Sequence, residues 1–126
     1  MREPNKDHET LLTYWQKNLG LQDWTVRLWD NCVPGADMGA DRRGECEYDE
    51  PSRAAVIRML AADRFPADAV LPYDYEQTLI HELLHCKFAI LDNSGDDLRD
   101  RILHQIIDSL ANALVTARRG QNATTV

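Results

Sequence analysis

Apolar and polar positions along the chain change from a helical to a strand-like spacing and back again. Near the N-terminus, apolar side chains recur every three or four residues, which predicts a first helix over about residues 5–19, closed by Gly20. Its apolar face consists of Leu11, Leu12, Trp15 and Leu19. Residues 24–29 alternate apolar and polar side chains, the period-two pattern of a strand.

Two further strands are expected after a Gly- and Pro-containing loop over residues 33–39. Residues 45–49 alternate acidic side chains with Cys46 and Tyr48, which predicts a half-exposed strand that ends by Pro51. Residues 54–60 are more apolar and predict a third strand, although the same run could begin a short helix.

A helix is predicted from Asp74, which resembles a capping residue with Gln77 three positions later, to about Leu91. Residues 92–95 are expected to break it. The order of helix, three strands, helix and helix predicts an α+β domain over residues 1–126, with a small antiparallel or mixed sheet packed on helices.

The last helix is expected to begin at Ser94, acting as a cap with Asp97, and to end at about Arg118 before a polar tail from Gly120. At about 100° per residue, one face of this helix is apolar and is predicted to be its core face. That face comprises Leu98, Ile102, Ile106, Leu110 and Ala113, and the flank beside it carries Asp100, His104, Asp108 and Ala111.

Composition and charge narrow the partners that we expect. A formal net charge of -7 and a pI near 4.9 argue against a nucleic-acid partner. No apolar run reaches the length of about 18 residues that a membrane helix needs, and the polar first residues lack a signal sequence, so we expect a cytoplasmic protein with no membrane partner. The three cysteines are odd in number and form no C-x-x-C pair, which predicts free thiols.

Candidate chemistry is concentrated in His81-Glu82-Leu83-Leu84-His85, a His-Glu-x-x-His motif within an apolar, helical stretch. Residues four apart lie on one face of a helix, so His81 and His85 can bind one Zn²⁺ together. Glu82 then lies at the edge of the site, where it could act as general base. A single helical histidine such as His8 is more often structural, but here motif, helix and apolar setting agree.

A catalytic zinc site needs a third protein ligand, and His104 is the leading candidate on the next helix. Asp108 or Asp100 are the alternatives. Asp108 follows His104 by four residues and could instead hold the second ring nitrogen of one of the three histidines, as carboxylates commonly do around zinc.

This constellation resembles the gluzincin class of zinc peptidases. By that resemblance His81 and His85 correspond to the two motif ligands, Glu82 to the general base and Asp108 to the supporting carboxylate. His104 takes the position of the family's ligating Glu, which is a departure. In motif terms the resemblance covers residues 78–113, and in layout the chain is similar to minimal phage-type metallopeptidases of this kind.

The resemblance implies one zinc ion per chain and hydrolysis of a peptide or protein substrate. Zinc would lower the pKa of a bound water to about 7, and Glu82 would pass the water's proton to the leaving amine. The strand before the motif helix would be an edge that pairs with the substrate, through Val56, Ile57 and Arg58. Tyr73, Tyr75 and Arg99 are the nearest candidates for stabilising an oxyanion.

Two other hypotheses remain open at this stage. The chain could bind zinc without turnover, using the site for stability or for recognition of a partner. It could also be a helical interaction module whose histidines are only structural. Zinc content separates the interaction module from the zinc peptidase and the zinc-binding protein. Replacement of Glu82 separates an enzyme from a binding protein.

Overall fold

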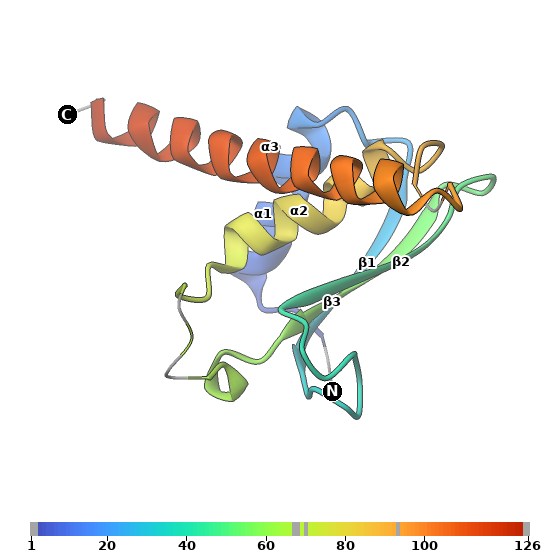
Figure 1. Ribbon diagram of the computed structural model, residues 1–126. Coiled ribbons are helices and arrows are strands. Elements are labelled where there is room, and N and C mark those ends of the chain that lie inside the picture. Colours follow the sequence, from blue (N-terminus) through green and yellow to red (C-terminus); the bar gives the residue numbers. More distant parts are fainter. Residues whose placement is uncertain (1–2, 67–68, 70, 93, 125–126) are drawn as a thin grey trace.

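The computed structural model describes residues 3–66, 69, 71–92 and 94–124 (Figure 1). The fold is α+β, in the predicted order of helix, sheet, helix and helix, and α2 lies between α3 and the sheet (Figure 1). The elements are α1 (Lys6–Asn18), β1 (Thr25–Cys32), β2 (Gly44–Asp49), β3 (Ala54–Leu60), the 3-10 turn η1 (Ala62–Arg64), α2 (Tyr75–Lys87) and α3 (Asp97–Thr124).

The sheet is mixed and has the strand order β1-β3-β2. β3 pairs in parallel with β1 and antiparallel with β2, so its backbone is hydrogen-bonded on both sides. The prediction that residues 54–60 form a substrate-binding edge is therefore wrong. The side chain of Ile57 is fully buried, while Arg58 forms ion pairs with Glu45 and Glu47. Val56, two residues before Arg58 on the strand, points to the same outer face of the sheet.

A buried carboxylate joins the three helices. Glu76 at the start of α2 accepts a hydrogen bond from Trp15 Nε1 of α1 at 2.8 Å. It also accepts from Arg118 Nη1 of α3, at 2.9 and 3.1 Å. Since a buried charge is costly unless it is paired and hydrogen-bonded, these partners are what allow Glu76 to lie in the core.

Helix α2 begins as predicted, because the side chain of Asp74 accepts a hydrogen bond from the backbone of Gln77 at 3.1 Å. It ends at Lys87, however, and not near Leu91. The chain turns after the cap residue Phe88, whose carbonyl accepts from the backbone N–H groups of Leu91 and Asp92. This early turn brings Asp92 back beside the helix.

Helix α3 starts and ends differently from the prediction. The carboxylate of Asp96, and not Ser94, caps the helix by accepting from the backbone N–H groups of Leu98 and Arg99. The helix also continues through Gly120 to Thr124, where a polar tail was predicted, since one glycine costs a helix only about 1 kcal/mol. Asn93, part of the predicted break, lies outside the described residues.

The core face predicted for α3 is also wrong. Leu103, Ile107, Ala111 and Val115 are buried, whereas Leu98, Ile102, Ile106, Leu110 and Ala113 are exposed. Both sets follow a helical spacing of three or four residues, so the spacing alone cannot say which one is covered. The buried set allows α3 to pack on α2 with the small Ala111 fully enclosed, and it turns His104 and Asp108 toward the histidines of α2.

The start of β2 approaches α2 so closely that Gly44 leaves no room for a side chain. A Cβ at this position would lie 2.7 Å from Thr78 Cγ2 and 3.2 Å from Glu82 Oε2. The φ of Gly44 is outside the left-handed region, so the requirement for glycine is one of space and not of backbone conformation. Gly44 thus allows β2 to contact the helix that carries the motif.

We expect Gly44→Ala to lower the free energy of unfolding by about 1–3 kcal/mol, because the added methyl overpacks the contact between β2 and α2. Urea denaturation measures this. Gly120→Ala is the matched control, since a Cβ there meets nothing within 4 Å and should stabilise the helix by about 0.5–1 kcal/mol. A Gly44→Ala variant as stable as the unmodified chain would contradict the packing described here.

Candidate metal centre

Three histidines from two helices converge at one point. His81 and His85 come from α2 and His104 from α3, and one ring nitrogen of each lies within 4.8 Å of the other two. The ring centroids are 5.2 Å apart for His81 and His85, and 4.9 and 5.8 Å from His104. Nitrogens bound to one tetrahedral zinc are about 3.3 Å apart. Small rotations of the side chains would therefore bring the three nitrogens to a common ion.

Carboxylates set the direction of both motif histidines. His81 Nδ1 lies 3.0 Å from Asp108 Oδ1, and His85 Nδ1 lies 3.0 Å from Asp92 Oδ2. An ionised carboxylate only accepts hydrogen bonds, so each Nδ1 carries the donated hydrogen and each Nε2 keeps its lone pair. This is the arrangement in which carboxylates orient zinc-binding imidazoles.

Asp108 lies where the sequence placed a supporting carboxylate, and it contacts His81. Asp92 was missed, because it was assigned only to a helix break. Helical spacing could not have indicated it, because a helix continued to Asp92 would place that residue about 10 Å along the axis from His85, and only the turn after Phe88 brings it back. Tyr48 of β2 donates to the same carboxylate oxygen at 3.0 Å, which ties the sheet to the site.

The two other candidates for the third ligand have other partners. Asp108 contacts His81, and Asp100 accepts hydrogen bonds from the backbone and hydroxyl of Ser94 at 2.9 and 2.8 Å. Within the described part of the chain, His81, His85 and His104 are the one group of His, Cys, Asp or Glu side chains that could share a metal ion. His104 is therefore the third ligand that the geometry favours.

The three histidines line a cavity of about 600 Å³. Helix α2 contributes Gln77, Thr78, Glu82 and the two motif histidines to its lining, and α3 contributes His104 and Asp108. Residues 41–44, before and at the start of β2, and Leu71 complete the lining. None of the predicted substrate-binding residues Val56, Ile57 and Arg58 lines this cavity.

The predicted oxyanion candidates do not line the cavity either. The hydroxyl of Tyr73 donates to the carbonyl of Leu60, and that of Tyr75 donates to Asp30. Arg42, which the sequence did not single out, does line the cavity. The charge of Arg42 lowers the pKa of Glu82, so its guanidinium is close enough to act on charge in the site.

Glu82 is the buried acid of the cavity, with 7% of its surface exposed. Its pKa is raised to about 8, chiefly by burial; the charge of Arg42 opposes this shift, and the charges of Glu45 and Asp92 add to it. Burial, together with the charges of His85 and His104, lowers the pKa of His81. The shift of His81 favours the neutral imidazole, which is the form that binds a metal ion.

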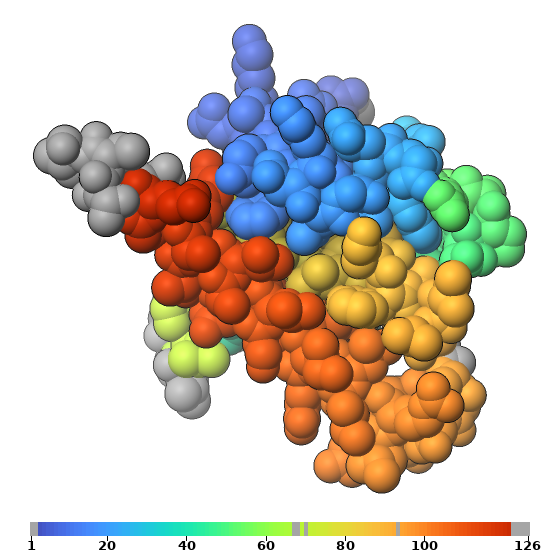
Figure 2. Space-filling model, turned by 90° about the horizontal axis from the view of Figure 1, so that it is seen from above, coloured from blue at the N-terminus to red at the C-terminus, as the bar shows by residue number. Residues whose placement is uncertain are grey.

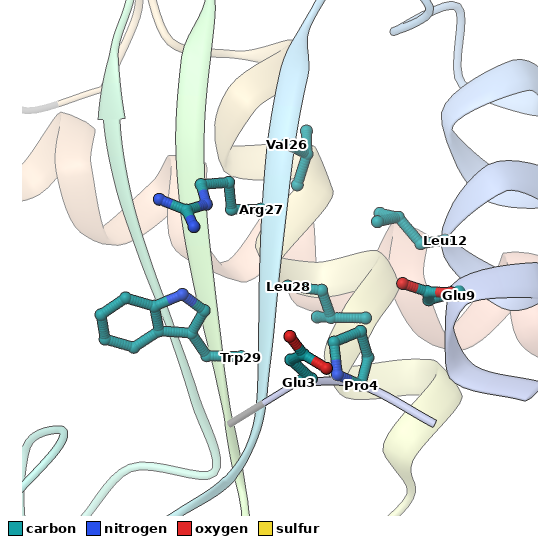
Figure 3. Close-up of a pocket in the computed structure, with 8 residues that line it drawn as sticks. All are labelled: Glu3, Pro4, Glu9, Leu12, Val26, Arg27, Leu28 and Trp29. Atoms are coloured by element: carbon teal, nitrogen blue, oxygen red, sulfur yellow. The ribbon is translucent and has the colours of Figure 1, made fainter. Parts of the chain in front are cut away.

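A second hollow, of about 570 Å³, lies between the N-terminal segment, α1 and β1 (Figure 3). Its lining includes the carboxylates of Glu3 and Glu9 and the apolar Leu12 and Leu28 (Figure 3). No histidine or cysteine lines it. The donor set suited to a transition metal therefore belongs to the histidine cavity and not to this hollow.

No family model, curated protein or solved structure matches this chain. The resemblance to gluzincins stays a prediction, and the function must be argued from the site itself. Among the residues that the structure describes, no helix is both long enough and apolar enough to cross a bilayer.

The pKa of Glu82 makes the stability of the metal-free chain depend on pH. The folded-state value of about 8 exceeds the ordinary value of 4.5, so the folded chain holds the proton more tightly and stability falls as the pH rises from 4.5 to 8. Above pH 8, we expect the metal-free Glu82→Gln variant to have a higher unfolding free energy than the unmodified chain, by a few kcal/mol, on the order of 1.4 kcal/mol per pKa unit. Near pH 4 the two unfolding free energies should not differ. Denaturation experiments across this pH range measure the difference in unfolding free energy between the two chains. A difference that is the same at every pH would contradict this prediction.

Removal of the carboxylate behind His85 should weaken metal binding. We expect Asp92→Ala to lower zinc affinity by about 10- to 100-fold, because the imidazole loses the group that fixes its tautomer and direction. Competition with a chromophoric chelator measures this. Tyr48→Phe is the control, since it removes the hydroxyl that contacts Asp92 and leaves the carboxylate in place. Equal affinities of Asp92→Ala and Tyr48→Phe would argue against the role of Asp92.

Proposed function

We propose that this protein is a zinc-dependent metallopeptidase in which Glu82 is the general base. The observation that carries the proposal is the convergence of His81, His85 and His104 beside a buried glutamate in an open cavity. The carboxylates of Asp92 and Asp108, each on the Nδ1 of one motif histidine, add support because they leave the Nε2 of both imidazoles available to a metal ion.

The donor set fits zinc. His81, His85 and His104 would hold the ion as three imidazole ligands, a set known for catalytic zinc sites that leave one position open. When bound, zinc supplies a Lewis acid that lowers the pKa of water and polarises a carbonyl oxygen.

Glu82 has the position and environment of a proton carrier. It is next to His81 in the motif and lines the same cavity. Because burial raises its pKa to about 8, its carboxylate is a stronger base than an exposed one. We infer that Glu82 takes a proton from the attacking water and delivers it to the amine nitrogen that leaves the cleaved peptide bond. Asp92 and Asp108 meanwhile keep the imidazoles in place.

The position of β2 supports an extended peptide as substrate. β2 is at the edge of the sheet, and its first residue, Gly44, lines the cavity. A peptide that pairs with the free edge of β2 would run past Glu82 and the histidines, with its backbone held by hydrogen bonds. β2 thus takes the role that the sequence assigned to residues 54–60.

Two substitutions test the proposal. We expect Glu82→Gln to reduce cleavage of a mixed peptide pool by at least about 100-fold, the range for loss of a general base, while zinc content is unchanged. His104→Ala should instead lose zinc, because only two of the three histidine ligands remain. Mass spectrometry of the pool and elemental analysis of the protein measure the two effects.

The outcomes separate the remaining hypotheses. Cleavage that survives Glu82→Gln would exclude Glu82 as the base. A chain that holds one zinc ion and cleaves nothing would be the non-catalytic zinc-binding protein. A chain that holds no zinc after purification and zinc addition would leave the histidines a structural role.

A further inference from the structure

Helix α3 carries a second apolar row that the fold does not cover. Leu98, Ile102, Ile106 and Leu110 are 62, 48, 45 and 38% exposed, although they repeat every four residues like the buried row of the same helix. The exposed row is about 18 Å long. Figure 2 looks onto α3, drawn in orange to red, and no other element lies over the helix in this view. A helix with two apolar faces typically packs against a partner on each of them.

The surface around the row carries few charges, with Arg99 on one flank and Arg101 on the other. At 3.6 residues per turn, the positions within about 80° of the centre of the row are small or uncharged, with the exception of Arg99. They include Gln105, Ser109, Ala113, Thr116 and Ala117, all exposed. Depletion of charge at the centre of an exposed patch distinguishes protein interfaces from ordinary surface.

We propose that this row, Leu98, Ile102, Ile106 and Leu110, binds the same row of a second copy of the chain, with the two α3 helices antiparallel. The order Leu, Ile, Ile, Leu at equal spacing reads the same from either end. A two-fold axis near residue 104 therefore places Leu98 on Leu110 of the second copy and Ile102 on Ile106. Self-complementary patches of this kind form closed dimers, and rows of four-residue spacing interlock in the commonest class of helix packing.

The position of Arg99 selects the antiparallel orientation. In a parallel pair the two Arg99 side chains would lie opposite each other and repel. In the antiparallel pair they lie about 15 Å apart along the helices, each opposite the uncharged Ser109 of the other copy. The contact follows a row about 18 Å long, so it is smaller than the interfaces of stable complexes and implies a weak, reversible dimer.

The dimer is independent of the metal centre. None of the four residues of the row lines the histidine cavity, to which α3 contributes His104 and Asp108. Pairing along the row leaves the cavity open in both copies. An experiment that disproves the dimer therefore leaves the proposed peptidase activity untouched, and the reverse also holds.

The test is the mass of the full chain in solution, by sedimentation or light scattering from low to high micromolar concentration. We expect the mass to rise from 14.4 kDa to twice that value. Ile106→Lys should stay at the monomer mass. Ile90→Lys is the matched control, since Ile90 is 83% exposed but lies in the turn after α2, beside Gly20 and Trp24, and this variant should dimerise normally.

A chain that stays at the monomer mass at every concentration overturns the proposal. So does dimerisation of Ile106→Lys, or equal loss of dimer in Ile90→Lys. Circular dichroism verifies that each variant is folded.

The orientation has its own test. Leu98→Lys and Leu110→Glu should each abolish the dimer, because each places two buried charges in the interface. The double variant should restore it, since an antiparallel pair brings each lysine onto a glutamate. A double variant that stays monomeric contradicts the antiparallel pairing.

Discussion

The burial of α2 on two sides fixes the direction of its two histidines. Leu79, Ile80 and Leu83 are fully enclosed between the sheet and α3, so the helix cannot rotate without exposing them. His81 and His85 occupy the remaining arc, which faces the cavity. The histidines can therefore be held rigidly although they are partly exposed to the cavity, and rigid support is what a metal site with an open position requires.

Two buried glutamates of α2 differ in the partners that surround them. Glu76 and Glu82 are each 7% exposed. Glu76 is paired with Arg118 and Trp15 and joins the helices. Glu82 faces the cavity, where burial raises its pKa. The fold thus neutralises one buried carboxylate with partners and keeps the other in a state that favours proton transfer.

Local patterns predicted the elements and much of the site, and non-local packing decided the rest. The motif, the cap at Asp74 and the spacing of His104 and Asp108 are properties of short stretches, and all were readable from the sequence. The central position of β3 depends on which strands pair, which alternation cannot tell. The choice between the two apolar rows of α3 depends on how that helix packs on α2, and the contact of Asp92 with His85 depends on where α2 ends.

In the proposed site, three histidines hold a zinc ion and one coordination position is left open. X-ray absorption at the zinc edge of the zinc-loaded chain tests this most directly. We expect three imidazole nitrogens and one further light atom, all at about 2.0–2.1 Å. A sulfur neighbour at about 2.3 Å, which would bring Cys46 or Cys86 into the site, or only two imidazoles would contradict the account.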